Sequence, residues 1–175
     1  HPNHCVTLIK RWQVKINGEL IALDSARGIG RSWVLQNDNL RVETFADSDS
    51  PCVFQTWHAA VPTRIELEIE FDLGAEASLI VEADGVIKAQ GRVAASLASS
   101  AQPLEVRVDR SALRAIYWIE DSLTLCLADG DSAKQLIANA SAARNEATIW
   151  SAWLSEQARG LQALPASMIT ACLAC

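Results

Sequence analysis

Strict alternation of apolar and charged residues marks the middle of the chain. In residues 64–71, apolar side chains occupy every second position, and Glu66, Glu68 and Glu70 occupy positions between them. Successive side chains of a β-strand point to opposite faces of the sheet, so this pattern predicts a strand with one buried and one solvated face. The same period of two recurs in residues 12–16, 104–108 and 123–127. The chain is therefore expected to be rich in strands.

Turn residues separate these segments. Asn17-Gly18 and Asp84-Gly85 supply the positive-φ residues that two-residue hairpin turns need. Asp38-Asn39 divides two further apolar segments, and Asp129-Gly130-Asp131 follows the segment that ends near residue 127. Short strands with frequent turns are typical of an antiparallel sandwich or barrel. We expect an all-β fold, an antiparallel β-sandwich of jelly-roll-like type.

Three regions depart from this alternation. Residues 94–102 are rich in Ala and Ser, which predicts an exposed connection. Residues 149–161 place apolar side chains at helical spacing, while residues 148–154 also fit a closing strand, and propensity favours the helix. After Gly160 the chain is small, apolar and interrupted by Pro165, which predicts a loose tail. The expected organisation is one sandwich domain over residues 1–157 and a tail over 158–175.

Composition sets limits on partners. The chain has 175 residues, 50% of them apolar, which suffices for one buried core. The net charge of −6 repels a phosphate backbone on average, so nucleic acid is not an expected partner. No apolar run approaches the roughly 20 residues of a membrane helix. A soluble, acidic domain follows, and its start at His1, with Met168 as its only methionine, predicts a processed product or a fragment.

Residues that hold metals or cofactors are sparse. Cys172 and Cys175 form a CxxC at the end of the chain without further ligands nearby, so no metal site is expected. The glycines Gly28 and Gly30 form a GxG that no strand-to-helix unit frames, so no dinucleotide cofactor is expected either. The five cysteines are too dispersed for a disulfide framework.

The glutamates of the alternating strand are the nearest approach to a catalytic pair. Glu66, Glu68 and Glu70 share one face at about 7 Å spacing, a separation that resembles the paired carboxylates of glycoside hydrolysis. Such a face is far more often the solvated side of an antiparallel sheet. We therefore expect no catalytic residue and no complete active centre in this chain. A small independent hydrolase that uses these glutamates or His58 is kept as an alternative.

Tryptophan is unusually frequent. The six tryptophans are Trp12, Trp33, Trp57, Trp118, Trp150 and Trp153. Their flat apolar rings can stack on the C–H faces of sugars while the indole N–H donates a hydrogen bond, although in strands they usually fill the core. Trp33 and Trp57 are flanked by polar residues and turns and are the expected exposed pair. Together with His58 they are the candidate ligand-binding residues.

One segment resembles a known family. Residues 104–111, and in particular Val108-Asp109-Arg110-Ser111, resemble the C-terminal β-sandwich of glycoside hydrolase family 32, the invertases, inulinases and levanases, where a strand with a VDxS-like motif leads into the next hairpin. Asp109 and Ser111 are expected to cap this turn through side-chain to backbone hydrogen bonds. Asn139-Ala140-Ser141 and then residues 147–154 resemble the closing region of that domain. Asn139 also fits the N-glycosylation pattern, which matters if the chain is secreted.

The resemblance implies a role beside an enzyme. Members of the family act on fructosyl units with acidic residues of a five-bladed propeller that precedes the sandwich, and the motifs of that propeller are missing here. The implied function is a secreted, non-catalytic accessory module of a fructan- or sucrose-active glycoside hydrolase, with a glycan or the propeller as partner. The alternative is a protein-interaction or homo-oligomerisation domain that uses the stripe Trp150, Trp153, Leu154 and Leu161.

Overall fold

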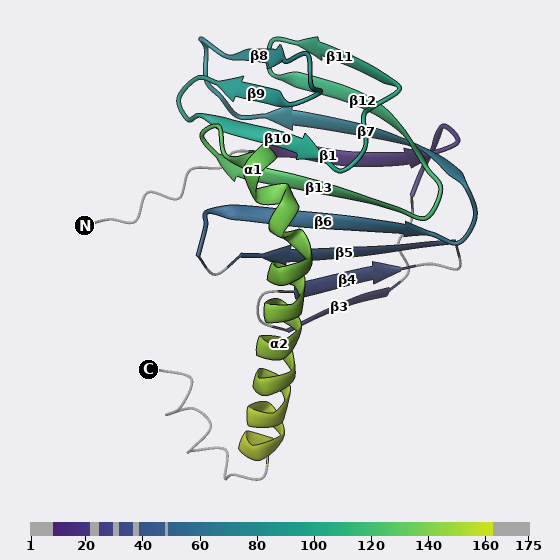
Figure 1. The fold of residues 1–175 in the computed structure, drawn as a ribbon, viewed down its shortest axis with the longest axis vertical. Helices are drawn as coiled ribbons and strands as arrows, with labels where there is room; N and C mark the ends of the chain where they lie inside the picture. Colours follow the sequence, from purple (N-terminus) through teal and green to yellow (C-terminus); the bar gives the residue numbers. More distant parts are fainter. Residues whose placement is uncertain (1–8, 22–24, 30–31, 37–38, 48, 163–175) are drawn as a thin grey trace.

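Two antiparallel sheets and a C-terminal helical segment make up the described part of the chain (Figure 1). In the computed structural model the described residues are 9–21, 25–29, 32–36, 39–47 and 49–162. The predicted all-β antiparallel sandwich is confirmed. The five-stranded sheet has the order β11 (Glu105–Asp109), β12 (Ala112–Ile119), β7 (Thr63–Phe71), β1 (Ile9–Ile16) and β2 (Glu19–Leu20).

The eight-stranded sheet lies opposite, and the helical segment follows its central strand. Its order is β3 (Ser25–Ile29), β4 (Ser32–Gln36), β5 (Leu40–Ala46), β6 (Cys52–Ala59), β13 (Ser122–Asp129), β10 (Ala95–Ser99), β9 (Ile87–Gln90) and β8 (Ser78–Val81). The chain then continues into α1 (Ala133–Leu136), the 3-10 turn η1 (Ile137–Asn139) and α2 (Ala140–Gln162).

The main core lies between the two sheets. Alternation along β7 turns Ile65, Leu67 and Ile69 inward, where they are buried against residues of the other sheet such as Leu97 and Leu123. Burying a side chain of this size contributes about 1.5–3 kcal/mol. The inward positions of β7 are those that the sequence pattern predicted.

The hairpins form where the turn residues predicted them. Asn17 at φ 51° and Gly18 at φ 90° connect β1 to β2, and Gly85 at φ 84° lies between β8 and β9. Positive φ carries little cost for glycine, which lacks a Cβ. Of the predicted Asp38-Asn39 turn, residue 38 lies outside the described residues.

A second core lies on the other side of the eight-stranded sheet. Phe45 and Phe54 stack there with ring centroids 5.3 Å apart, and Ala133, Ala143 and Ala147 of the helical segment cover the same face. The small alanine side chains let the helices approach the strands closely. Figure 1 shows α2 running across the strands of this sheet and continuing beyond β3.

The structure corrects one assignment and decides another. Residues 94–102 were expected to be an exposed connection, but Ala95–Ser99 is the buried strand β10. The prediction was wrong because small side chains are suited to the place where α1 packs on the sheet: the buried Ser96 Oγ accepts a hydrogen bond from the Ala133 N–H at 3.1 Å. The C-terminal segment is the helix α2 and not a strand.

The predicted boundary between the sandwich domain and the tail coincides with a helix. α2 ends at Gln162, so the expected boundary at residue 157 falls inside it. Residues 163–175, which include Cys172 and Cys175, lie outside the described residues, and the tail stays a prediction.

Candidate functional site

The side of the five-stranded sheet that faces away from the core carries most of the sheet's charged side chains. We call it the outer charged face. Its members alternate with core residues, and cross-strand register places them side by side. They are Arg11, Gln13 and Lys15 of β1, Arg64, Glu66, Glu68 and Glu70 of β7, Glu105, Arg107 and Asp109 of β11, and Ala112, Arg114, Ile116 and Trp118 of β12.

A ladder of ion pairs crosses the centre of this face. Arg114 donates to both carboxylate oxygens of Glu66, from Nε at 2.7 Å and from Nη2 at 2.8 Å. Lys15 Nζ donates to Glu68 Oε1 at 2.7 Å and lies 3.7 Å from Glu66 Oε1. The Arg114 hydrogen bonds, aided by the charges of Arg114 and Lys15, lower the pKa of Glu66 although burial opposes this shift.

This ladder bears on catalysis by the glutamates. A general acid of a glycosidase needs a raised carboxyl pKa, and the pKa of Glu66 is lowered. Glu70 has cationic neighbours as well, because Arg11 Nη2 lies 3.7 Å and Lys10 Nζ 4.0 Å from its carboxylate. Glu66 is thus a buried carboxylate between Arg114 and Lys15, and Glu68 and Glu70 are partly exposed with cationic partners. This pairing disfavours the alternative of an independent hydrolase on this face.

A shallow hollow of about 440 Å³ lies at one end of the face. The short side chain of Ala112 leaves room between longer ones, among them Arg11, Glu70, Arg107 and Asp109. Guanidinium groups donate hydrogen bonds and carboxylates accept them, so the rim offers both kinds of partner. This mixture suits a neutral ligand with many hydroxyl groups.

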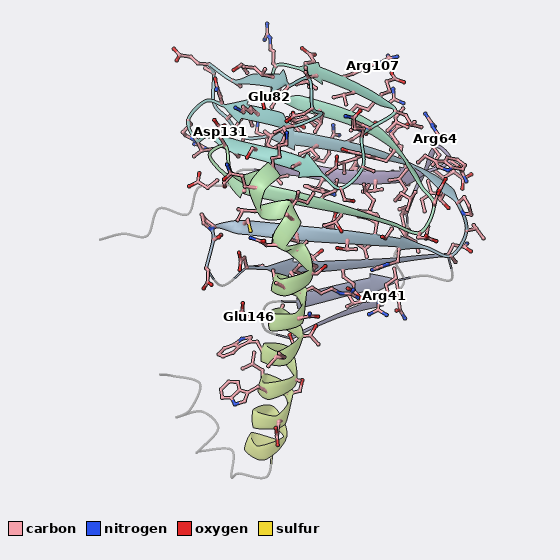
Figure 2. All side chains as sticks on the ribbon, in the orientation of Figure 1. Arg41, Arg64, Glu82, Arg107, Asp131 and Glu146 are labelled. Atoms are coloured by element: carbon pink, nitrogen blue, oxygen red, sulfur yellow. The ribbon has the colours of Figure 1, made fainter. Side chains whose placement is uncertain are left out.

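Trp118 lies toward the other end of the same face. Its residue is 49% exposed, and it pairs in register with Arg64, which lies at the margin of the sandwich near the start of β7 (Figure 2). On β12, Trp118 follows Arg114 by four positions and Ala112 by six, and both of these residues line the hollow. At about 3.3 Å per residue Trp118 is about 13 Å from the first and about 20 Å from the second. An exposed aromatic ring and a polar hollow therefore share one open surface.

The predicted pair of exposed tryptophans is not supported for Trp57. Trp57 is 3% exposed and belongs to the core between the sheets, so its expected exposure is wrong. Strand parity explains the error, because Trp57 points inward whereas His58 points to the opposite face of β6. Trp57 and His58 consequently do not form one site. The backbone of Trp33 pairs with Thr44, while its side chain lies outside what the structure describes, and its exposure stays a prediction.

His58 lies among charged residues on the helix-bearing side of the eight-stranded sheet. It pairs in register with Arg41 of β5 and with Ser122 of β13. Burial lowers the pKa of His58, and Arg144 and Arg41 lower it further while Glu43 raises it. Among the described residues its Nε2 is buried without a hydrogen-bond partner. Neutral imidazole is favoured at pH 7.

The thiols near His58 in sequence do not form a nucleophile with it. Cys52 and Cys126 are buried beneath the helices, and burial raises the pKa of both thiols, that of Cys126 to about 12. A protonated thiol is a poor nucleophile. Cys52 also precedes His58 by six positions on β6, which separates them by about 20 Å.

The residues taken from the VDxS-like motif lie at a hairpin. Asp109 ends β11, and Ser111 precedes β12, with Arg110 between them at φ 46°. The Ser111 carbonyl accepts a hydrogen bond from the Phe71 N–H at 2.8 Å, which joins the turn to β7. Capping by the two side chains stays a prediction. Asn139 is exposed at the end of η1, and its glycosylation stays a prediction as well.

Sequence reasoning missed the residues that form the outer charged face with the glutamates. Trp118 could have been found from parity, since it alternates with the buried Tyr117 and Ile119 in an otherwise apolar segment. Arg114 and Lys15 could not, because they lie 48 and 53 positions from the glutamates that they contact. Strand order brings them together.

The described residues also bear on metal binding and on membrane insertion. Across residues 9–162, apart from the short undescribed gaps, no group of three His, Cys, Asp or Glu side chains is arranged to hold a metal ion. In the same part of the chain no helix is both long and apolar enough to cross a membrane.

Comparisons with known proteins give the following picture. No family model and no curated protein matches the chain. Among solved structures, a putative kojibiose phosphorylase from the human microbiome aligns with a TM-score of 0.46 and 10% identity over 82% of this chain. The aligned part is 25% of that protein, so the chain spans about a quarter of its length. The fold defines an antiparallel β-sandwich with a C-terminal helix, and membership of glycoside hydrolase family 32 stays a prediction.

Proposed function

We propose that this chain is a non-catalytic carbohydrate-binding β-sandwich module and that the outer charged face is its binding surface. The observation that carries the proposal is the half-exposed Trp118 on an open sheet face that also offers hydrogen-bonding groups. An indole ring stacks on the apolar C–H face of a pyranose or furanose ring. Neighbouring carboxylates and guanidiniums then bind the hydroxyl groups at the edge of the sugar.

The ion-pair ladder supports this role physically. Its side chains are already held by one another, as in the bidentate contact of Arg114 with Glu66, so a ligand does not need to order them. The distance of about 13–20 Å between Trp118 and the residues of β12 that line the hollow favours an oligosaccharide over a single sugar.

The finer proposal concerns the parent protein. The VDxS-like motif that resembles glycoside hydrolase family 32 ends at the hairpin of Asp109 and Ser111, and Asp109 lines the hollow. This position supports an accessory role beside a fructan- or sucrose-active enzyme, with fructose oligomers as the first ligands to test.

Calorimetric titration of the whole chain with a glycan panel tests the proposal. The panel contains fructo-oligosaccharides of the inulin and levan types, sucrose, and gluco- and xylo-oligosaccharides. We expect binding to at least one oligosaccharide and a loss of about tenfold in affinity for Trp118→Ala, equal to about 1.4 kcal/mol. Trp150→Ala, an exposed tryptophan on α2, is the matched control and should bind like the unmodified chain.

Two results would contradict the proposal. The first is the absence of binding heat with every glycan at millimolar concentration. The second is an equal loss of affinity in Trp118→Ala and in the control Trp150→Ala, because the binding surface would then not be the outer charged face. Binding to glucans but not to fructans would keep the module and reject the fructan-specific role.

A second candidate function rests on α2. Ile149, Trp150 and Trp153 are 71%, 42% and 47% exposed, and the two indoles stack with centroids 5.0 Å apart. Exposed apolar groups of this size on one helix are typical of an interaction surface. Leu154 is partly buried, and the side chain of Leu161 lies outside the described residues. Light scattering of the unmodified chain and of a Trp150→Ser, Trp153→Ser double variant tests self-association through this surface. A monomeric mass of the unmodified chain at high concentration would exclude self-association.

A further inference from the structure

A hollow of about 450 Å³ lies where α2 passes β5, on the side of the eight-stranded sheet that faces away from the main core. We call it the α2–β5 hollow. Its lining includes Arg41, Glu43 and Phe45 of β5 and Arg144, Asn145 and Thr148 of α2. Figure 2 shows Arg41 and Glu146 on opposite sides of α2, so the hollow lies on the side away from Glu146.

A buried carboxylate brings two arginines together in this hollow. Glu43 is 6% exposed, and each of its carboxylate oxygens contacts a different guanidinium. Arg41 Nη2 lies 2.6 Å from Oε1, and Arg144 Nε lies 2.6 Å from Oε2. Since a buried carboxylate is stable only when paired, Glu43 fixes where both cationic groups lie.

The two arginines do not have the same structural role. The contact between Arg144 and Glu43 ties α2 to the sheet. Arg41, in contrast, is two positions from Glu43 on the same strand and the same face, so its contact joins no separate elements. The contact between Glu43 and Arg144 is enough to hold α2 on the sheet. It does not explain why a second guanidinium, that of Arg41, also contacts Glu43.

The charges in the hollow do not balance. Two guanidiniums and one carboxylate leave a net charge of +1, on a chain whose total charge is −6. Each guanidinium has five N–H donors, and the two arginines together have more donors than the single carboxylate of Glu43 can accept. The side chains of Arg41 and Arg144 are 53% and 45% exposed, so the remaining donors are accessible to a second acceptor.

We propose that the α2–β5 hollow binds an oxyanion, the carboxylate or phosphate group of a small ligand, through Arg41 and Arg144, with Glu43 as the positioning residue. Guanidinium donors bind planar and tetrahedral oxyanions through charge-assisted hydrogen bonds. The amide of Asn145 adds a neutral hydrogen-bonding group, and Phe45 provides an apolar wall. A hollow of this volume suits a small acid or a phosphorylated sugar.

This site does not depend on the proposed glycan surface. The outer charged face belongs to the five-stranded sheet, and the α2–β5 hollow belongs to the eight-stranded sheet and α2. No residue lines both hollows. Failure of one proposal therefore leaves the other unchanged.

Calorimetric titration of the whole chain at low ionic strength tests the site. The probes are inorganic phosphate, glucose 6-phosphate, glucuronate and glucose. We expect binding of at least one anion, no binding of glucose in this hollow, and a loss of about tenfold in anion affinity for Arg41→Ala. The comparison of phosphate with glucuronate shows which oxyanion the arginines accept.

The matched control is Arg92→Ala, which removes an equally exposed arginine that lines neither of the two hollows. It has the same change of net charge as Arg41→Ala, so any general effect of charge is equal in both. Arg41→Ala leaves the tether between Arg144 and Glu43 in place, and an unchanged melting temperature verifies the fold. Arg41→Lys, which keeps the charge but loses the planar donors, is expected to bind with intermediate affinity.

Each outcome decides the proposal. Loss of anion binding in Arg41→Ala with retention in Arg92→Ala supports it. No binding of any anion by the unmodified chain overturns it, as does an equal loss in the two variants. Binding that glucose competes away would also overturn it, because the ligand group would then not be the oxyanion.

Discussion

The outer faces of the two sheets differ in what covers them. On the eight-stranded sheet, Phe54 and Cys126 are fully buried beneath the helical segment. On the five-stranded sheet, Trp118 is exposed and the glutamates of β7 are paired with arginine and lysine. Both faces come from alternating strands, so alternation alone does not decide which face is solvated. The composition of the outward positions decides it: small and aromatic side chains predominate beneath the helices, whereas most outward side chains of the five-stranded sheet are charged.

The largest expected effect tests this difference in stability. Phe54→Ala removes a fully buried ring from the covered face and is expected to lower the free energy of unfolding by about 3–5 kcal/mol. Trp118→Ala removes a larger ring from the open face and is expected to change it by less than about 0.5 kcal/mol. Urea denaturation of both variants is the measurement. A larger loss for Trp118→Ala would show that the five-stranded sheet is covered in solution.

Ion pairs hold the charged side chains of the five-stranded sheet, the buried Glu66 among them, which predicts a dependence on pH. Glu66→Gln removes the bidentate contact with Arg114 and is expected to cost about 1–2 kcal/mol at pH 7. The folded-state pKa of Glu66 is lowered, so its contribution is complete above the unfolded pKa of about 4.3 and is lost as the pH falls through the lower folded value.

The measurement is the free energy of unfolding of both proteins between pH 7 and pH 3. The difference between the unmodified chain and Glu66→Gln should narrow as the solution becomes acidic. Glu70→Gln, whose cationic neighbours are more distant and more exposed, is the matched control and should show a smaller difference at every pH. A difference that grows toward pH 3 would contradict the lowered pKa.

The fold could be predicted from the sequence wherever the pattern was local. The period of two in β7 and the turn at Asn17-Gly18 depend on neighbouring residues, and both were correct. The strand Ala95–Ser99 was missed because Ala and Ser carry no clear preference, and it is the docking of α1 that buries them. The helix-or-strand choice at α2 was open because apolar spacing permits both, and alanines packed on Phe54 favour the helix.

The candidate site was less accessible to sequence reasoning than the fold. The exposure of Trp57 was inferred from its polar neighbours in the sequence. Those neighbours alternate between the two faces of β6, so they do not show which face the Trp57 side chain occupies. The contact between Glu43 and Arg144 joins a strand to a helix that is a hundred positions away. Such contacts arise from the order of strands and helices in space, and the residues around each partner in the sequence do not indicate them.

A moderate effect is expected at the hairpin beside the open face. Arg110 has φ 46°, a left-handed conformation that costs about 1 kcal/mol for a residue with a Cβ. Arg110→Gly removes this cost but adds freedom to the unfolded chain, so a net gain in stability below about 1 kcal/mol is expected. Arg110→Ala keeps the Cβ and should show no such gain. Thermal unfolding of both variants provides the comparison, and equal melting temperatures would contradict the argument.

The smallest expected effect concerns the two faces of α2. Ala143 and Ala147 are buried in the second core, whereas Ile149, on another face of the helix, is one of the most exposed apolar side chains in the described part of the chain. Ile149→Lys should change the free energy of unfolding of a monomer by less than about 0.5 kcal/mol, because the Ile149 side chain is exposed and is not part of either core. A dilution series that combines unfolding with light scattering distinguishes two cases. If Ile149→Lys lowers the free energy of unfolding only at high protein concentration, the exposed face of α2 is covered by another copy of the chain. The contrast between covered and open faces then includes this helix face, which is open in a single chain and covered in the assembly.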